Sequence, residues 1–263
     1  DIGMSGKGRQ TQRLDKILTH MGYGSRSDIK RQVKQGMITV NGRIIKDSGL
    51  QVHPYQDQIE VNGELVVFRE YIYIMLHKPP GVISATEDTR ERTVLDLLSA
   101  EERHFEPFPV GRLDKDTEGL LLLTNDGKLA HELLSPRRHV PKTYEATVLG
   151  LVTEEDILQF TAGVELDDGY VTLPAQLTIL RHEQPHQADG EVISYISLVI
   201  HEGKFHQVKR MFEAVGKRVT YLKRTAMGPL KLDDQLPLGS YRELTSEELA
   251  LIGRDIVSAT SEA

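Results

Sequence analysis

The sequence contains no cysteine among its 263 residues. This absence excludes disulfide bonds, zinc sites built from thiolates, iron–sulfur clusters and any mechanism with a cysteine nucleophile. It is typical of proteins in a reducing compartment, so we expect a cytoplasmic protein. No stretch approaches the roughly 18 consecutive apolar residues of a membrane-spanning helix, and the first residues lack the apolar run of a secretory signal. We therefore expect no membrane partner.

The glycine-rich fingerprints of nucleotide-binding folds are also missing, so we expect no nucleotide cofactor. One segment, 182–186, fits the pattern His-Glu-x-x-His, which binds zinc in metalloproteases. That chemistry requires both histidines on one turn of a regular helix. Pro185 removes a backbone donor and disfavours a helix at the residue before it. We therefore expect a polar loop here, no metal site, and not a metallohydrolase.

Charge is distributed unevenly along the chain, whose net charge is −7. Residues 1–50 contain ten Lys or Arg and four Asp or Glu, a net +6, which leaves −13 for the remainder. A basic N-terminal region on an otherwise acidic chain suggests that this region binds a polyanion such as nucleic acid. The alternative is a solvated charged surface without a ligand.

The basic region is predicted to begin with two short helices. Over 13–22 the apolar residues recur at i, i+3, i+4 and i+7, as in an amphipathic helix. Ser25 is a suitable cap for a second helix over 26–35, which Gly36 ends. This second helix is unusually basic.

Short strands follow, because the Asn-Gly turn at 41–42 lies between β-prone runs over 37–40 and 43–46. A further run over 58–61 is followed by a second Asn-Gly turn at 62–63. The segments 13–16 and 36–42, together with the helix pair, resemble the S-four-type RNA-binding domain over about 13–66. This domain occurs in proteins of unrelated activities, so the resemblance implies RNA contact and no particular chemistry. We expect its basic residues to contact RNA phosphates: Arg13, Lys16, Arg26, Lys30, Arg31 and Lys34.

Beyond a charged linker, 67–72, predicted strands outnumber helices. The strands are expected at 72–76, 120–124, 143–149, 171–180, 192–200 and 219–223, and the helices at 93–99, 128–134, 153–161, 204–215 and 245–252. This pattern favours an α+β fold: a small N-terminal α/β domain, then a larger domain over 73–252 with a mainly antiparallel mixed sheet flanked by helices. Residues 253–263 are expected to be a flexible tail.

The most informative segment is 110–127, a loop rich in acidic residues and glycine that leads into the apolar strand 120–124. By itself such a loop indicates either turn chemistry or a functional site. The stretch Gly111-Arg112-Leu113-Asp114, followed by Asp-Thr-Glu-Gly-Leu-Leu-Leu-Leu-Thr-Asn-Asp-Gly over 116–127, resembles the signature of RsuA-type pseudouridine synthases and their large-subunit relatives. Further family-like segments lie at 77–81, before this stretch, and at 142–144, 202–211 and 239–244, after it. The resemblance therefore covers about 13–252.

The resemblance implies that Asp114 is the catalytic carboxylate of a uridine isomerase. The reaction breaks the bond between the ring nitrogen and the sugar, turns the base and joins the sugar to ring carbon five. It needs no redox step or group donor, so no cofactor is expected. An ionised carboxylate can attack the anomeric carbon or take a sugar proton to give a glycal. The resemblance further implies that Tyr144 stacks on the uracil and helps to remove the proton from carbon five.

The predicted helix 204–215 has an apolar stripe that belongs to the core and, opposite it, a basic face with His206, Lys209 and Arg210. This face is either a solvated surface or part of the site. The resemblance implies that Lys209 pairs with Asp114. It leaves Arg210 a phosphate-binding or secondary role. The other candidates for RNA binding are Arg112, Lys142 and His206.

The family resemblance also bears on the substrate. The segment His206-Gln207-Val208-Lys209 resembles the small-subunit branch, whereas the large-subunit branch tends to have Arg in place of His206 and Lys209. We therefore expect modification of 16S rRNA by a monomer that acts on rRNA or on a ribosomal assembly intermediate. The alternatives are a 23S rRNA synthase and a non-catalytic ribosome-associated RNA-binding protein. A binder would not need an ionised carboxylate that faces RNA phosphates.

Overall fold

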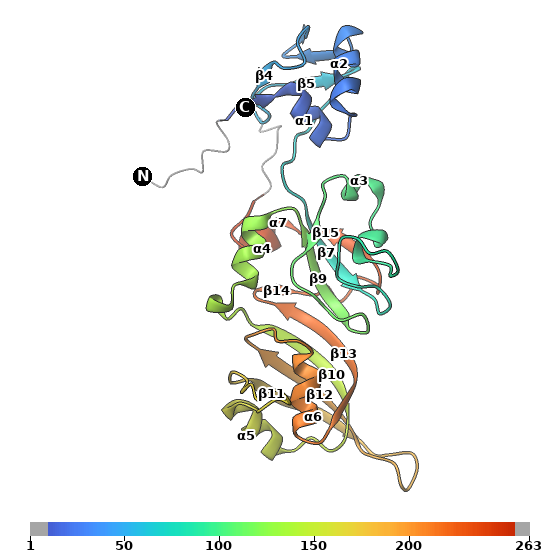
Figure 1. Ribbon diagram of the computed structural model, residues 1–263, viewed down its shortest axis with the longest axis vertical. Coiled ribbons are helices and arrows are strands. Elements are labelled where there is room, and N and C mark those ends of the chain that lie inside the picture. Colours follow the sequence, from blue (N-terminus) through green and yellow to red (C-terminus); the bar gives the residue numbers. More distant parts are fainter. Residues whose placement is uncertain (1–9, 256–263) are drawn as a thin grey trace. The chain divides into compact units, whose positions relative to one another are not determined.

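The computed structural model describes residues 10–255, which form two units shown in Figure 1. Of the described residues, the first unit comprises 10–72, 99–106 and 254–255, and the second comprises 73–98 and 107–253. Within the described residues no helix is long and apolar enough to cross a membrane. Most of the predicted tail, from 256 on, lies outside the described residues.

The first unit contains both predicted helices, α1 (Leu14–His20) and α2 (Arg26–Lys34). Ser25 caps α2 as expected: its Oγ accepts a hydrogen bond from the backbone nitrogen of Asp28 at 3.2 Å, and Asp28 Oδ2 accepts one from Ser25 N at 2.9 Å. This reciprocal pair satisfies two backbone donors that a helix start leaves free. The cap thereby fixes where the basic helix begins.

A four-stranded antiparallel sheet follows, with the order β3-β2-β5-β6. Its strands are β2 (Ile38–Val40), β3 (Arg43–Ile44), β5 (Ile59–Val61) and β6 (Glu64–Leu65), while β1 (Gln12–Arg13) pairs separately with β4 (Gln51–Val52). Both predicted hairpins are present. Their turns contain Asn41 and Asn62 with φ of 53° and 51°, a conformation that asparagine tolerates better than most residues.

The core of this unit extends past the predicted domain end at 66. Phe68 is 2% exposed and packs in the same apolar cluster as Leu14 and Ile59. The interval 99–106, which contains α3 (Ala100–Arg103), also belongs to this unit. The ring of Phe105 meets His20 edge-on at 5.5 Å. Nothing in the sequence pattern predicts that placement.

The second unit is built on one nine-stranded sheet within the described residues, with the order β11-β12-β10-β13-β9-β7-β15. The two remaining strands lie off this order: β8 pairs with β9, and β14 pairs with β13. The strands are β7 (Tyr73–Lys78), β8 (Phe108–Pro109), β9 (Glu118–Thr124), β10 (Lys142–Leu149), β11 (Gln176–Glu183), β12 (Ile193–Ile200), β13 (Arg218–Met227), β14 (Leu230–Lys231) and β15 (Tyr241–Glu243). All pairs are antiparallel except β9 with β13. The predicted mixed, mainly antiparallel sheet is confirmed.

The α-helices of the second unit are α4 (Gly127–Leu134), α5 (Glu154–Ala162), α6 (Gln207–Ala214) and α7 (Ser246–Leu251), and the short 3-10 helices are η2 (Val94–Leu97) and η3 (Pro136–Arg138). Helix α5 contacts β11 and α6 contacts β13, and these two helices meet through Phe160 and Phe212 at 5.0 Å. This packing fixes α6 against the sheet, and α6 carries part of the site described below.

The elements predicted at 93–99 and 171–180 differ from the structure. The predicted helix 93–99 is only the 3-10 turn η2, because Leu98 and Ser99 are extended and Ser99 starts α3 as its N-cap. The predicted strand 171–180 is β11, which begins five residues later. Pro174 has no backbone N–H, so the regular ladder starts after it.

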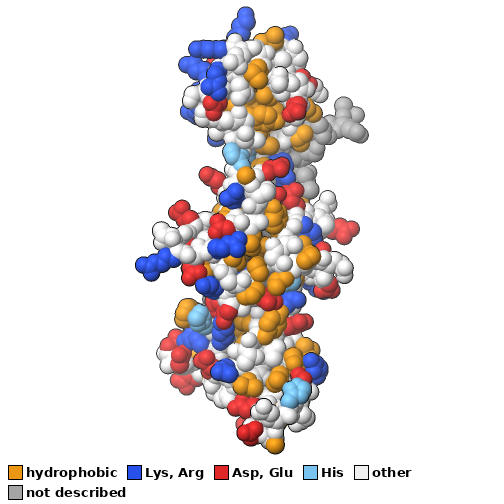
Figure 2. All heavy atoms as spheres, turned by 90° about the vertical axis from the view of Figure 1, so that its right-hand side faces the viewer, with side chains coloured by type: hydrophobic (Ala, Val, Ile, Leu, Met, Phe, Trp, Pro, Cys, Tyr) orange, Lys and Arg blue, Asp and Glu red, His pale blue; other side chains and the backbone are white. Residues whose placement is uncertain are grey.

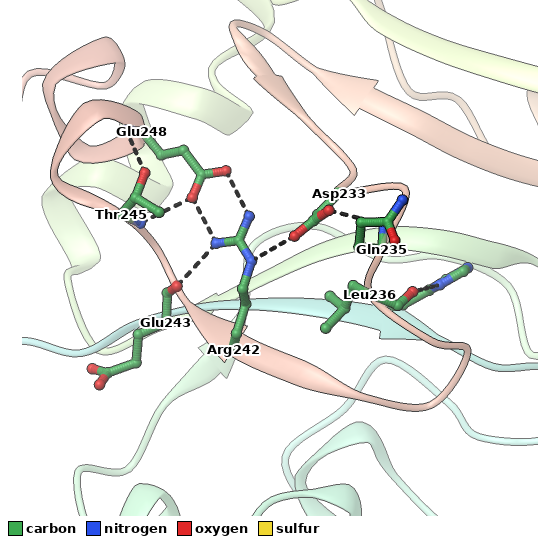
Figure 3. A network of polar contacts seen from close by, with 8 residues as sticks. Asp233, Gln235, Leu236, Arg242, Glu243, Thr245 and Glu248 are labelled. Atoms are coloured by element: carbon green, nitrogen blue, oxygen red, sulfur yellow. Dashed lines mark hydrogen bonds and ion pairs between the residues drawn. The ribbon is translucent and has the colours of Figure 1, made fainter.

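The edge strand β15 is fastened by the guanidinium of Arg242 (Figure 3). Its Nε donates to Asp233 Oδ2 at 3.0 Å, and its Nη1 donates to Glu248 Oε1 at 2.7 Å. The same Glu248 oxygen accepts the backbone N–H of Thr245, the cap of α7. One arginine thus joins the segment before β15 to the helix after it.

Candidate active site

The loop 110–117 runs from β8 to β9 and presents Asp114, whose side chain is 33% exposed. The buried hydroxyl of Ser84 fixes this loop through two hydrogen bonds to its backbone. Its Oγ accepts the backbone N–H of Leu113 at 3.0 Å and donates to the carbonyl of Leu113 at 2.9 Å. Because both polar groups of Leu113 are held, the backbone next to Asp114 is fixed.

Lys78, at the end of β7, holds the same loop from the protein interior. It is fully buried, and its Nζ donates to the carbonyl oxygens of Thr117 at 2.8 Å, Pro79 at 3.0 Å and Lys115 at 3.2 Å. Desolvation lowers the pKa of Lys78 to about 8, while nearby acidic residues of the loop act in the opposite direction. Lys78 lies in the family-like segment 77–81, and the family resemblance gives it no role. The sequence feature that could have identified Lys78 is a lysine at the end of an apolar strand.

Helix α6 approaches Asp114 from the other side, and it begins at Gln207, three residues later than predicted. His206 is its N-cap and has a left-handed backbone with φ of 50°. The buried side chain of Gln207 closes the turn before the helix. Its Oε1 accepts the backbone N–H of Lys204 at 3.0 Å, and its Nε2 donates to Glu202 Oε2 at 3.1 Å. This turn positions His206 beside the carboxylate of Asp114.

His206 and Lys209 contact opposite oxygens of Asp114. His206 Nε2 lies 3.4 Å from Oδ1, and Lys209 Nζ lies 3.6 Å from Oδ2. Lys209 also donates to both carboxylate oxygens of Asp116, at 2.8 and 3.0 Å, and this bond is the main cause that lowers the pKa of Asp116. The family resemblance gives Asp116 no role, although Asp116 belongs to the motif over 116–127. Its position two residues after Asp114 in the same loop is the signal that could have found it.

His206, Lys209 and Arg210 line one cavity together with Asp167 and Asp168, so the predicted basic face is present. His206 lies outside the helix, and successive helical residues point roughly 100° apart, so Arg210 diverges from Lys209. The Arg210 guanidinium pairs with Asp167 at 2.7 Å and Asp168 at 3.0 Å. Its charge is therefore balanced by two carboxylates away from Asp114. A role of Arg210 in binding phosphate stays a prediction.

Tyr144 and Arg112 lie at the same pocket as Asp114. Tyr144 projects from β10, is 8% exposed, and lines a pocket of about 80 Å³ together with Asp114, Arg112 and Lys209. Arg112 is exposed at the pocket rim. Lys142, two residues before Tyr144, does not line this pocket. Its Nζ lies 3.4 Å from the carbonyl of Val140, and burial lowers its pKa.

A wider cleft of about 830 Å³ shares Asp114, Arg112 and His206 with this pocket and continues past Gly81 and Phe205. It is lined by backbone and side chains of the second unit alone. The cleft and the smaller pocket therefore meet at Asp114.

The histidine pair of the segment 182–186 does not sit on a helix. His182 and Glu183 end strand β11, and His182 Nε2 lies 2.9 Å from the carbonyl oxygen of Val152. The prediction of a loop is therefore wrong for these two residues. The zinc motif would need a helical turn at this place. Among the described residues no group of three His, Cys, Asp or Glu could hold a metal ion.

All six basic residues proposed for the first unit are exposed. Arg13 pairs with Asp15 and Arg31 with Asp28, each at 2.9 Å. The other four form no ion pair within the described part of the chain: Lys16, Arg26, Lys30 and Lys34. Figure 2 shows Lys and Arg side chains gathered along one side of this unit, at the top of the view.

The comparisons with known proteins agree with this geometry. The sequence profile of the RNA pseudouridylate synthase family matches residues 72–214, and that of the S4 domain matches 12–59. Together with the pocket around Asp114 they define the class of protein, an RNA pseudouridine synthase, which is an isomerase. The chain belongs to the RsuA-type pseudouridine synthases with an N-terminal S4 domain, as the sequence motifs predict. A non-catalytic binding protein is not supported.

Several relatives align over almost their full length. The chain is 52% identical over 240 residues to the uncharacterized RNA pseudouridine synthase YtzG of Bacillus subtilis (91% of this chain, 98% of the relative). It is 41% identical to the ribosomal large subunit pseudouridine synthase B of the same species (90% and 94%) and 38% identical to the ribosomal small subunit pseudouridine synthase A of Yersinia pestis (92% and 98%). A crystal structure of a pseudouridylate synthase aligns with a TM-score of 0.61 at 34% identity, over 92% of this chain and 99% of that one.

Proposed function

We propose that this enzyme isomerises a uridine of small-subunit (16S) rRNA, with Asp114 as the catalytic carboxylate. The observation that carries the proposal is the placement of His206 and Lys209 at 3.4 and 3.6 Å from the two oxygens of Asp114. These are the positions at which the small-subunit and large-subunit branches of the family tend to differ. The residues that support the substrate assignment therefore lie beside the reacting group.

The reaction is balanced within the substrate. The bond from N1 of uracil to C1′ breaks, a bond from C5 to C1′ forms, C5 loses its proton, and N1 gains one. Asp114 starts this sequence either by attack on C1′ or by removal of the 2′ proton, and both routes require a carboxylate fixed beside the ribose. The hydrogen bonds that Ser84 makes to Leu113 provide that fixed position.

Tyr144 and Lys209 have different parts in this proposal. Tyr144 forms a wall of the pocket, where its ring stacks on the target uracil and its hydroxyl assists the loss of the C5 proton. Lys209 places a positive charge near Asp114. This charge compensates for the negative charge that the phosphates bring into the cleft.

The first unit supplies affinity that does not depend on sequence. Its unpaired basic residues contact phosphates of rRNA or of a ribosomal assembly intermediate, with Arg112 as an additional contact beside the cleft. Phosphate contacts position a nucleic acid, whereas the catalytic pocket selects the base. The protein acts as a monomer in this proposal.

The experiment that tests the substrate is incubation of the purified protein with 16S and 23S rRNA, each as naked transcript and as ribosomal particle. Pseudouridine is then mapped by primer extension after carbodiimide modification. We expect one new site in 16S rRNA, and the same site should be missing in a deletion strain. A new site in 23S rRNA alone would overturn the assignment.

A second candidate is modification of 23S rRNA. The observation in its favour is the relative named for the ribosomal large subunit, which is 41% identical over 239 residues. The experiment above separates the two candidates directly, because both rRNAs are offered to the same enzyme. His206→Arg with Lys209→Arg would further show whether these two positions influence the choice.

A further inference from the structure

Phe205 is the most exposed large hydrophobic side chain of the described residues, at 75%. Its ring stacks on the imidazole of His206, with ring centres 3.8 Å apart and planes 17° apart. His206 in turn lies 3.4 Å from Asp114. The Phe205 ring is thus stacked on a residue that contacts Asp114, and most of its surface is exposed.

The backbone around Phe205 is fixed although the ring is exposed. The carbonyl of Phe205 accepts a hydrogen bond from Arg210 Nη1 at 2.7 Å, and Arg210 is anchored by Asp167 and Asp168. On the other side, the buried Gln207 holds the backbone N–H of Lys204. The loop therefore presents the ring in a defined place. The position of Phe205 is therefore fixed by hydrogen bonds of its loop, since its ring is not buried in the core.

The ring also lines the wide cleft that contains Asp114. The neighbouring Lys204 is exposed and lies at the same cleft, with its Nζ 4.8 Å from the centre of the Tyr170 ring. An aromatic face beside a basic side chain is the combination that proteins use to bind unstacked nucleotides, because every base has a flat face and every linkage a negative charge.

We propose that Phe205 is a stacking platform for a nucleobase of the same RNA strand, next to the target uridine. This inference rests on the proposed function. When the target base leaves its stack, its neighbour loses a stacking partner, and the open face of Phe205 replaces that partner. The contact is indifferent to the identity of the base. It orients the strand so that the ribose of the target lies over Asp114.

The first test compares Phe205→Ala, Phe205→Leu and Phe205→Tyr in the full-length protein, with 16S transcript binding measured by filter retention. Leu158→Ala is the matched control, because Leu158 is 69% exposed on α5 and lines neither cavity. We expect Ala to weaken binding by about 5- to 100-fold, as loss of one stacked base does. Leu should weaken it nearly as much, while Tyr and the control should stay within threefold of the wild type.

The second test uses 20-nucleotide RNA fragments around the mapped uridine, each with one abasic nucleotide at one of the four nearest positions. At the stacked position, the abasic RNA should bind the wild type and Phe205→Ala equally, because the contact is already absent. Full retention of affinity by Phe205→Leu would overturn the proposal, and so would equal penalties at all four positions. An effect confined to ribosomal particles would instead indicate a protein contact and would also overturn it.

These outcomes are separate from the fate of the proposed function. If the wild type forms no pseudouridine in 16S rRNA, the substrate proposal fails. The transcript-binding series still reports on Phe205, since it requires no turnover, and the abasic series then uses the fragment from whichever rRNA is modified. Conversely, normal modification with unchanged binding by Phe205→Ala rejects the stacking platform alone.

Discussion

The ammonium of Lys209 makes two hydrogen bonds to the carboxylate of Asp116, at 2.8 and 3.0 Å. Its distance to the nearer oxygen of Asp114 is longer, 3.6 Å. Asp116 is 72% exposed and Asp114 is 33% exposed. One lysine is therefore shared by two acids that differ in solvent access, and the more buried acid is the one beside the pocket. This difference separates their expected roles.

Asp114→Asn should abolish isomerisation while the fold and RNA affinity are retained. The amide is nearly isosteric but neither charged nor nucleophilic, so we expect a loss of at least about 10³-fold in kcat. Asp116→Asn is the matched control in the same loop, and it should remain within about tenfold of the wild type. The measurements are tritium release from C5-labelled rRNA and filter binding. Equal losses in both variants would argue against Asp114 as the reacting group.

Lys209→Met should lower kcat more than it weakens RNA binding, because Lys209 contacts Asp114 and Asp116 of the loop 110–117. Lys209→Arg should retain part of the activity, since the charge remains while the geometry changes. In the Met variant the pKa of Asp116 should rise, because the hydrogen bond from Lys209 is the main cause that lowers it. NMR titration of the carboxyl groups checks this shift. A variant that binds poorly but turns over normally would identify Lys209 as a phosphate contact.

Replacement of the four unpaired basic residues of the first unit by alanine should flatten the salt dependence of rRNA binding. Each lost phosphate contact reduces the slope of log K against log salt by about 0.7–0.9, so four contacts reduce it by about 3. These residues are Lys16, Arg26, Lys30 and Lys34. The control is Lys128→Ala in α4, an exposed lysine of the second unit. An unchanged slope would mean that this surface does not meet the phosphates.

Stability should depend on pH through Lys78. Burial lowers the pKa of Lys78 from the ordinary 10.5 to about 8 in the folded protein, so between these values the unfolded chain binds more protons. The contribution of Lys78 to the free energy of unfolding therefore rises with pH across this window, by at most about 1.4 kcal/mol per pH unit. Urea unfolding of the wild type and Lys78→Met from pH 7 to 10 measures it. A constant difference between the two proteins would contradict the shift.

Much of the first unit could be predicted because its signals are local. Ser25 caps the helix that follows within three residues, and Asn41 sits in the turn between two adjacent strands. Apolar spacing gives the buried face of α1 directly. The same holds for β9, whose run of leucines marks a strand that is almost wholly buried.

The parts that could not be predicted depend on residues far apart in the chain. Helix α6 starts late because Gln207 binds its own preceding turn and Glu202, and Arg210 turns toward Asp167. Lys78 contacts Thr117 across 39 residues. Spacing rules describe one helix face or one strand at a time. The position of Lys209 near Asp114 was therefore predicted only from the family resemblance, and its hydrogen bond to Asp116 was not predicted.

The parallel pair β9–β13 has a consequence for how the enzyme is made. A Cβ on Gly119 would lie 2.2 Å from the carbonyl oxygen of Arg224, so these strands can close only on glycine. The pairing joins residues far apart in the chain, and it brings the loop of Asp114 to the helix of Lys209. Synthesis proceeds at roughly 5–20 residues per second, so the segments of the first unit precede β13 by on the order of ten seconds. We therefore expect each nascent chain to have a nearly complete RNA-binding unit for some seconds before it has an active site.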